Sequence, residues 1–238
     1  MANASSTPLL AIEGLSVFYN QFRAVSGVDL AVAAGEIVSI IGANGAGKSS
    51  LLKAIIAQVG RIEGSIRFDG QDITTRSTAR IVASGIAMVP EGRRLFPTLT
   101  VEENLTLGWE VGRRGGLKMT EIFDFFPMLR EKRRTPAGQL SGGQQQMVAL
   151  GRALLADPRL LLCDEISLGL APTIINDLYV LLQKINQRGI GMILVEQDIS
   201  RSLAVADRFY CFLEGKVSLT GRPGTTDRET IMKHYFGS

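Results

Sequence analysis

The sequence predicts an α/β protein with a parallel-sheet core, an antiparallel β region near the N-terminus and a helical lobe inserted into the core. Three observations support this fold class. Short, β-branched apolar runs alternate with segments of helical periodicity, which is typical of a parallel sheet covered by helices. Residues 9–19 and 25–32 alternate or run apolar like an antiparallel pair. The stretch from about residue 92 to residue 157 is mostly helical in pattern.

Length and composition limit the classes of protein to consider. The chain has 238 residues, 45% hydrophobic and 21% charged, which is ordinary for a soluble globular domain. A formal net charge of +3 is too small to indicate nucleic-acid binding by itself. Cys163 and Cys211 lie in apolar runs, which indicates buried thiols in a reducing compartment. The polar start, MANASSTP, lacks the pattern of a signal peptide, and no apolar run is long enough to span a membrane.

Each element of the core is predicted from its own pattern. Residues 36–41 are typical of a buried strand, and a glycine-rich turn joins them to a helix with Leu52, Ile55 and Val59 on one face. Further strands are predicted at residues 64–69, 85–89, 160–165 and 191–196, and a further helix at about 172–187.

Capping signals and apolar spacing predict the lobe. Thr100 and Glu103 fit a capping box before an apolar helix. Residues 108–118 are rich in glycine and arginine, so we expect an exposed loop there. A helix is expected after Thr120, kinked or shortened at Pro127. We therefore expect one domain over residues 1–238, with a core of residues 1–91 and 158–238 and a helical subdomain of residues 92–157.

The glycine-rich turn has the spacing of a phosphate-binding loop. Residues 42–49, GANGAGKS, fit the pattern G-x-x-x-x-G-K-[ST]. Glycines let successive backbone N–H groups converge on phosphate oxygens, and the next helix presents its positive end to the same place. Lys48 is expected to contact the β- and γ-phosphates, and the Ser49 hydroxyl to bind Mg²⁺. The predicted nucleotide-binding residues of this loop are Gly42, Ala43, Asn44, Gly45, Ala46, Gly47, Lys48, Ser49 and Ser50.

Two acidic residues follow an apolar run. Asp164 and Glu165 end the predicted strand 160–165. Because ligands of open α/β sheets bind at the carboxyl ends of strands, Asp164 is expected to hold the shell of Mg²⁺. Glu165 is expected to polarise the attacking water as general base. An exposed acidic turn is the alternative, but the phosphate-binding loop in the same chain favours ATP hydrolysis with ATP and Mg²⁺ bound.

A third motif points to a family. Leu140-Ser141-Gly142-Gly143-Gln144 places a serine and two glycines at the start of a predicted helix, which makes a second anion site. With GRAL at residues 151–154, it resembles the signature of the ATP-binding cassette (ABC) superfamily, and the resemblance covers nearly the whole chain. It implies a P-loop NTPase (RecA-like) core and a head-to-tail dimer. Each ATP would lie between one subunit's phosphate-binding loop and the other subunit's signature.

The resemblance assigns roles to further residues. Tyr19 is implied to stack on adenine, with a half-buried strand tyrosine as the alternative. Glu91 stands where most of the superfamily has Gln and is implied to join Ser49 and Asp164 near Mg²⁺. Gln197 stands where most members have His, and its amide can still bond the γ-phosphate, so it is counted with Lys48 and Glu165 as catalytic.

Ile166 is a further departure, because the superfamily usually has proline after the acidic pair. Losing proline frees the backbone. We hypothesise that Glu165 is consequently held less rigidly, that turnover is reduced, and that Ile166→Pro raises ATPase activity.

Three strings narrow the resemblance. GANGAGKS, VPEGRRLFPTLTVEENL and SLGLAP look like the second ATP-binding subunit (LivF type) of bacterial branched-chain amino-acid uptake systems. This resemblance implies a peripheral ATPase at the cytoplasmic face of the bacterial inner membrane. Its partners would be two membrane permease subunits, a sister ABC ATPase in a homo- or heterodimer and, indirectly, an extracytoplasmic solute-binding protein, with no nucleic acid.

Other functions stay open at this point. A close alternative is the ATPase of an importer for urea, amides or another small polar solute. A nucleotide-binding regulator with weak hydrolysis is a second alternative, because of Ile166 and Gln197. A soluble cassette protein of DNA repair or translation is a third, but such proteins usually carry coiled-coil or zinc insertions that this sequence lacks.

Overall fold

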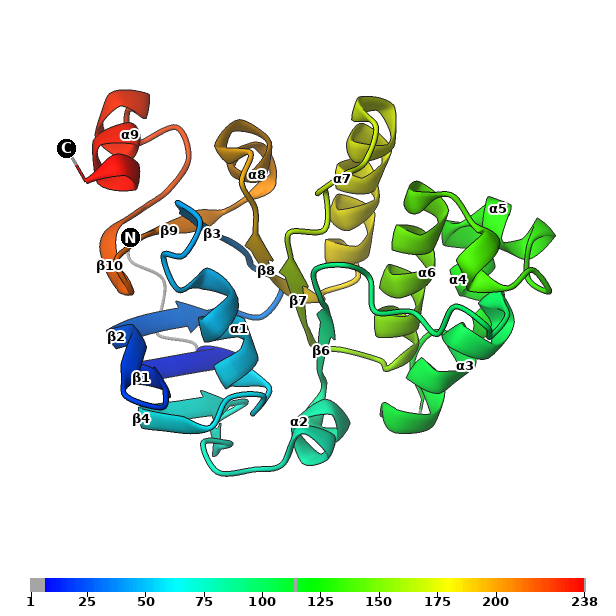
Figure 1. Cartoon of the computed structure of the whole chain (residues 1–238), viewed down its shortest axis with the longest axis horizontal. Helices are drawn as coiled ribbons and strands as arrows, with labels where there is room; N and C mark the ends of the chain where they lie inside the picture. The colour runs from blue at the N-terminus through cyan, green and yellow to red at the C-terminus, as the bar shows by residue number, and fades with distance from the viewer. Residues whose placement is uncertain (1–6, 114, 238) are drawn as a thin grey trace.

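Two β-sheets organise the structure (Figure 1). The computed structural model describes residues 7–113 and 115–237, so most of the polar MANASSTP segment lies outside the described residues. The first sheet has four strands in the order β2-β1-β4-β5, and the second has six in the order β10-β9-β3-β8-β7-β6. The predicted α/β fold class, with an antiparallel region near the N-terminus, is confirmed.

The smaller sheet consists of antiparallel strands. β1 (Leu10–Tyr19) pairs antiparallel with β2 (Phe22–Val32) and with β4 (Arg61–Phe68), and the short β5 (Gln71–Asp72) pairs antiparallel with β4. In β1 the side chains of Leu10, Ile12, Leu15 and Val17 are buried in the core, as expected for a sheet with one solvated face. The turn between β1 and β2 places Tyr19 directly opposite Phe22.

The larger sheet is parallel except at one edge. Its parallel strands are β3 (Ile37–Gly42), β6 (Ile86–Val89), β7 (Leu160–Asp164), β8 (Gly191–Val195) and β9 (Arg208–Leu213), and β10 (Lys216–Gly221) pairs antiparallel with β9. Every residue of β3, β7 and β8 is buried, which explains their continuous apolar sequence. Because the parallel strands run in one direction, their carboxyl ends meet along the same edge.

Separate hydrophobic clusters cover the two faces of this sheet. Leu160 and Leu162 face one cluster, together with α1 (Lys48–Ile55) and the smaller sheet. Leu161 and Cys163 face the other cluster, because successive residues of a strand point to opposite faces. Further helices complete the fold, namely α2 (Thr78–Ser84), α7 (Pro172–Asn186), α8 (Ile199–Val205) and α9 (Arg228–Phe236). Both cysteines are buried and free, as predicted.

Four helices form the lobe on the right of Figure 1. They are α3 (Val101–Val111), α4 (Met119–Phe125), α5 (Pro127–Glu131) and α6 (Gly142–Leu155), with a 3-10 turn at Ala137–Gln139. The capping box at the start of α3 is confirmed, as is the interruption at Pro127, which begins a new helix. The division of the chain at residues 92 and 157 stays a prediction.

The expected loop at residues 108–118 is wrong in its first part, because α3 continues to Val111. Gly108 is buried in this helix, and a Cβ built on it would lie 1.9 Å from the carbonyl oxygen of Arg152 in α6. The glycine therefore permits close packing of two helices, a role that its sequence neighbourhood does not reveal.

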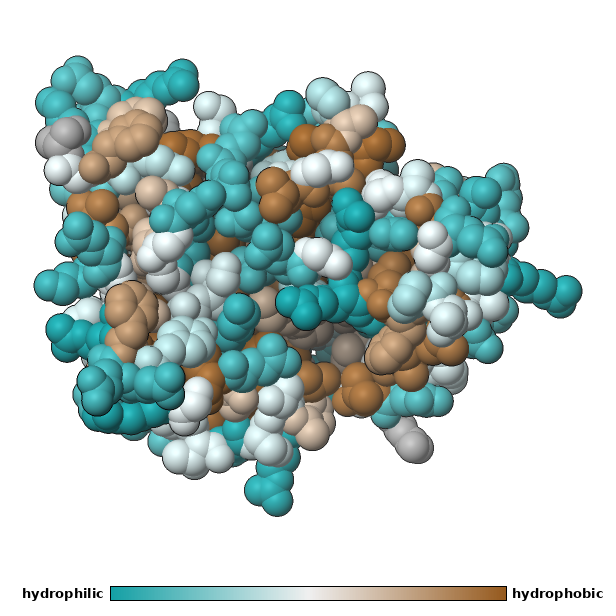
Figure 2. All heavy atoms as spheres, in the orientation of Figure 1, coloured by the Kyte–Doolittle hydropathy of each residue, from teal (hydrophilic) through white to brown (hydrophobic). Residues whose placement is uncertain are grey.

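Polar residues dominate the surface seen in Figure 2, where hydrophobic side chains form separate patches. Residues 130–134, REKRR, form a basic stretch of the lobe that is exposed to solvent. Within residues 7–113 and 115–237, no helix combines the length and the apolar character that crossing a membrane requires.

Candidate nucleotide site

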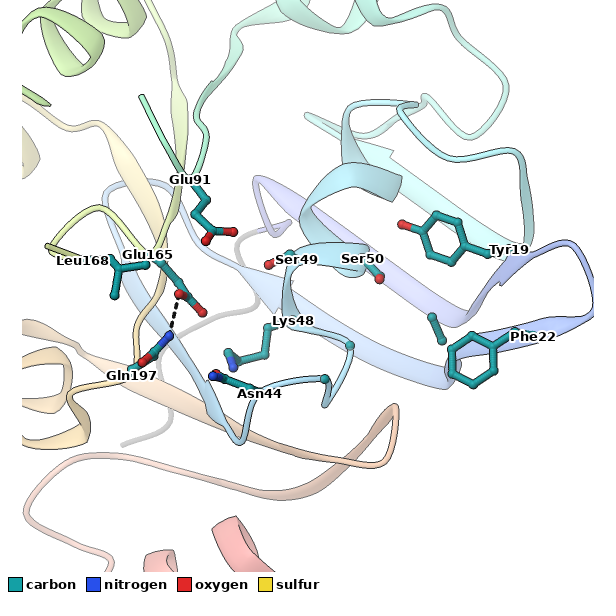
Figure 3. A pocket seen from close by; sticks show the side chains of 13 residues that line it. Tyr19, Phe22, Asn44, Lys48, Ser49, Ser50, Glu91, Glu165, Leu168 and Gln197 are labelled. Atoms are coloured by element: carbon teal, nitrogen blue, oxygen red, sulfur yellow. Dashed lines mark hydrogen bonds between the residues drawn. The ribbon is translucent and has the colours of Figure 1, made fainter. Parts of the chain in front are cut away.

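A cleft of about 550 Å³ opens at the carboxyl edge of the parallel strands (Figure 3). Glu91, Glu165 and Gln197 follow β6, β7 and β8, and the loop 42–49 follows β3. Since these strands are neighbours in the larger sheet, four segments that are distant in sequence meet at one place. The lining residues are Tyr19, Phe22, Ala24, Asn44, Gly45, Gly47, Lys48, Ser49, Ser50, Glu91, Glu165, Leu168 and Gln197.

Two glycines of the loop are required by their surroundings. Gly42 has φ +155°, and a Cβ there would lie 2.4 Å from the Phe212 carbonyl oxygen. Gly47 has φ +99°, and its Cβ would lie 2.5 Å from the carbonyl oxygen of Ala24. The glycine pattern thus lets the loop pack closely on β9 and β2 and leaves its backbone open toward the cleft.

Lys48 is held inside the loop. Its Nζ donates to the carbonyl oxygens of Gly42 at 2.7 Å and Ala43 at 3.0 Å, and the residue is 4% exposed. Burial lowers the pKa of the Lys48 ammonium, whereas the nearby Glu165 and Asp164 raise it. The Lys48 ammonium is therefore a partly desolvated cation enclosed by the loop of residues 42–49.

Oxygen atoms gather beside the loop. The Ser49 hydroxyl donates to Asp164 Oδ1 at 2.9 Å, and Asp164 is buried at the end of β7. Burial raises the pKa of the Asp164 carboxyl; the Ser49 hydrogen bond opposes this shift, and the charges of Glu165 and Glu91 add to it. The three residues expected around Mg²⁺, namely Ser49, Asp164 and Glu91, therefore come from three elements and lie in one region.

Glu165 and Gln197 form a pair across the ends of β7 and β8 (Figure 3). Gln197 Nε2 donates to Glu165 Oε2 at 2.7 Å, and the Glu165 backbone N–H donates to the Val195 carbonyl at 2.8 Å. Glu165 has φ +49°, an uncommon conformation for a residue other than glycine that is often found at functional sites.

The hypothesis that Ile166 loosens Glu165 stays a prediction, and several contacts in the structure bear on it. The side chain and the backbone of Glu165 are both hydrogen-bonded. Ile166 is buried in the hydrophobic cluster that also contains Leu161 and Cys163, so it anchors the backbone by packing. A proline at this position would also disfavour the left-handed conformation of the residue before it. Ile166 is therefore held by packing, and we expect proline to fit this backbone less well.

Two aromatic rings form the wall of the cleft opposite Glu165 and Gln197 (Figure 3). Tyr19 is 40% exposed and Phe22 is 69% exposed, so neither ring is a core residue. From the sequence we predicted one aromatic ring in the nucleotide site, that of Tyr19. Phe22 was missed, although its position across a two-residue turn from Tyr19 is a signal that strand pairing could have supplied.

The signature residues 140–144 do not line this cleft. Ser141 caps α6, since the Gln144 N–H donates to Ser141 Oγ at 3.4 Å and Gln144 Oε1 accepts from the Ser141 N–H at 3.0 Å. Ser141 itself is exposed. Within one chain, the fold does not bring this motif to the phosphate-binding loop.

Known proteins share this arrangement. A family model described as ABC transporter matches residues 25–167, which is more than half of the chain. The chain belongs to the ABC transporter family. This ABC protein is 41% identical over 211 residues to the high-affinity branched-chain amino acid transport ATP-binding protein BraG of Pseudomonas aeruginosa, covering 88% of this chain and 91% of that protein.

More distant relatives are also ATP-binding proteins of transport or export systems. The ABC protein is 31% identical to the probable branched-chain amino acid transport ATP-binding protein LivF of Archaeoglobus fulgidus, covering 87% of this chain and 89% of that one. It is also 31% identical to the lipopolysaccharide export system ATP-binding protein LptB of Haemophilus influenzae, covering 96% and 97%.

Solved structures agree with the fold. The ADP conformation of an ATP-binding cassette of an ABC transporter superimposes with a TM-score of 0.84 at 26% identity, covering 98% of this chain and 100% of that one. A dimeric cassette in a post-hydrolysis state, bound to ADP and Pi, gives a TM-score of 0.80 at 26% identity, covering 90% and 98%. The ABC protein is therefore an ATP-binding chain with the ATP-hydrolysing cassette of its family.

Proposed function

We propose that this ABC protein hydrolyses ATP to power an importer of branched-chain amino acids through partner permeases. One observation carries the ATPase part of the proposal: a phosphate-binding loop, a partly buried Ser49–Asp164 pair and the Glu165–Gln197 pair meet at one sheet edge. The cargo rests on the resemblance to BraG and LivF, because no cargo-binding site is expected on an ATPase subunit.

The loop of residues 42–50 and the aromatic wall would bind the nucleotide. Backbone N–H groups of the loop and the start of α1 would bind the phosphates, with Lys48 adding a charge to the β- and γ-phosphates. Tyr19 and Phe22 line the other side of the cleft, and a purine between them and the loop would stack on an aromatic face.

The oxygen atoms beside the loop fit Mg²⁺. Ser49, Asp164 and Glu91 offer only oxygen donors, which this hard cation prefers. Among the described residues, no group of three or more His, Cys, Asp and Glu could hold a metal ion. Phosphates and water would complete the shell of the ion. Bound Mg²⁺ would neutralise charge that develops on the transferred phosphoryl group.

Glu165 and Gln197 would direct the chemistry. Glu165 would accept a proton from the attacking water, and the hydrogen bond from Gln197 would hold its carboxylate toward the cleft. Lys48 would stabilise the charge on the phosphoryl oxygens. The signature residues Leu140, Ser141, Gly142, Gly143 and Gln144 would contact the ATP of a partner subunit, because they lie outside this chain's own cleft.

A second groove fits the proposed permease partners. It measures about 380 Å³ and is lined by residues including Lys53, Met88, Arg94 and Arg152. Glu91 lines both this groove and the nucleotide cleft, so a permease element in the groove would touch a residue on the metal side of the site. We propose that two permeases, a sister ATPase and an extracytoplasmic binding protein complete the system at the cytoplasmic face of the inner membrane.

Transport by the reconstituted system tests the function. The chain would be co-purified with the permeases and the sister ATPase encoded beside it, placed in proteoliposomes with the binding protein, and supplied with ATP. ATP-dependent uptake of labelled leucine, isoleucine or valine is expected. Uptake of urea or amides alone would support the alternative cargo, and ATP binding without stimulated hydrolysis would support a regulatory cassette.

Removal of the Tyr19 ring is expected to weaken ATP binding. Stacking of a base on an aromatic side chain contributes about 1–3 kcal/mol, so Tyr19→Ala should raise the Kd for ATP by about 5- to 150-fold. Calorimetric titration measures this change, and binding of inorganic triphosphate, which has no base, serves as the control. Equal losses for ATP and triphosphate would contradict stacking, and Phe22→Ala shows whether the second ring contributes.

Ile166→Pro is expected to lower ATP turnover several-fold, in contrast to the expectation from sequence. The substitution removes a buried side chain and opposes the positive φ of Glu165. Steady-state phosphate release by the assembled complex measures the effect. Ile166→Val is the matched control, because it keeps the packing and introduces no restriction on Glu165. An increase in turnover with proline would restore the original hypothesis.

A further inference from the structure

One buried carboxyl group has no role in the mechanism described so far. Glu196 follows β8, lies between Val195 and Gln197, and is only 2% exposed. A glutamate is rarely buried to this extent unless it has partners. The partner here is Ser167, whose backbone N–H donates to Glu196 Oε1 at 3.2 Å and whose hydroxyl donates to Glu196 Oε2 at 2.6 Å.

These two hydrogen bonds are part of a larger connection between two segments. Ser167 lies two residues after Glu165, and Glu196 lies one residue before Gln197. The Glu165 N–H donates to the Val195 carbonyl, and Gln197 donates to the Glu165 carboxylate. Four hydrogen bonds therefore join residues 165–167 to residues 195–197, and the Glu165–Gln197 pair is one of them.

A carboxyl group is costly at this position. Burial raises the pKa of Glu196 to about 7, and the hydrogen bonds from Ser167 oppose that rise. Replacing buried charged groups by apolar ones of similar volume is often neutral or stabilising in proteins. Stability alone therefore does not account for a glutamate here, whereas a geometric function would.

We propose that Glu196 is a positioning residue for ATP hydrolysis, which clamps the loop after β7 through Ser167 and thereby fixes Glu165 and Gln197 toward the cleft. This inference rests on the proposed role of Glu165 as general base. Glu196 does not line the cleft, so it acts through these neighbours and not on the nucleotide. Displacement of a catalytic group by about 1 Å can slow a reaction by about 10²-fold.

Substitutions at both ends of the clamp test the proposal in the assembled complex. Glu196→Ala and Ser167→Ala are each expected to lower kcat about 10-fold. The KM for ATP should stay within about twofold, because the loop 42–50 lies on a different element. The double variant should be no slower than the slower single variant, since both remove the same contact. Glu196→Gln should retain most activity, because its amide can accept from the Ser167 N–H and donate to the hydroxyl.

The outcomes separate the clamp from a general packing role. Unchanged kcat in Ser167→Ala, additive losses in the double variant, or parallel changes in kcat, KM and melting temperature would overturn the proposal. If Glu196→Ala fails to fold, Ser167→Ala paired with Ser167→Thr, which keeps the hydroxyl, decides the question. Loss of turnover in Glu165→Gln with no effect of Ser167→Ala would reject the clamp alone, and normal turnover in Glu165→Gln would reject the proposed catalytic base.

Discussion

Replacing Glu165 by glutamine is expected to lower ATP turnover by about 10²- to 10⁴-fold, the contribution usually measured for a general base. The amide keeps the size of the side chain but cannot accept a proton from water. ATP binding should change little, because the phosphate contacts expected from residues 42–50 remain. Phosphate release by the assembled complex measures turnover, and calorimetric titration measures ATP binding.

Glu13→Gln provides the matched control for this experiment. Glu13 is an exposed residue of β1 that does not line the cleft, so the same chemical change there should leave turnover unaltered. Turnover near the wild-type rate in Glu165→Gln would contradict both the catalytic role of Glu165 and the proposed direction of the attacking water. It would then favour the regulatory interpretation, in which the Glu165–Gln197 pair holds nucleotide without hydrolysing it.

Ser141→Arg is expected to abolish turnover, with a loss of about 100-fold or more, while ATP binding to the separate chain is retained. The signature at the start of α6 lies outside the chain's own cleft, so a large cation there should not disturb nucleotide binding in one subunit. In the proposed head-to-tail dimer the same residue would face the partner's γ-phosphate, and its loss would remove stabilisation of developing charge. Binding and turnover should therefore respond differently.

The chain offers a closely matched control in Ser77. This exposed serine stands at the N-cap of α2 without a side-chain capping hydrogen bond, so Ser77→Arg makes the same change at another helix start. It should leave ATP turnover near the wild-type rate. Equal turnover in Ser77→Arg and Ser141→Arg would contradict a composite site, and so would an equal loss of ATP binding in the separate Ser141→Arg chain.

The two substitutions together distinguish two halves of one proposed site. Glu165 lines the cleft of its own chain, whereas Ser141 is exposed at the start of a helix in the lobe. Mixed dimers that carry one substitution on each subunit would show whether either half suffices alone.

Departures from the superfamily pattern have local explanations in this structure. Gln197 replaces the usual histidine and is bonded to Glu165, so an amide can hold the carboxylate without adding a titrating group. Ile166 replaces the usual proline and is buried, next to a backbone that proline would disfavour. Both departures leave Lys48, Asp164 and Glu165, the groups proposed to act in hydrolysis, in place.

Local patterns predicted much of the fold. The capping box at Thr100 and Glu103, the helix break at Pro127 and the buried strands were predicted correctly, because each depends on residues that are neighbours in sequence. The loop expected at residues 108–118 was partly wrong, because Gly108 serves a contact with a helix some forty residues away. Asn104 shows the same limit, since its buried side chain holds the preceding loop through hydrogen bonds to Phe96, Leu99 and Thr100.

The sequence by itself determined the chemistry: fixed spacing along a covalent chain puts Lys48 and Ser49 at the start of a helix and Asp164 and Glu165 at the end of a strand. Only the tertiary structure decided which of these groups meet. The order of the parallel strands brings Glu91 and Gln197 to the same edge of the sheet. The turn between β1 and β2 adds Phe22 to the cleft, whereas Ser141, at the start of α6, lies outside it. Such neighbours are set by strand order and packing between distant segments, and these contacts have no fixed spacing in the sequence.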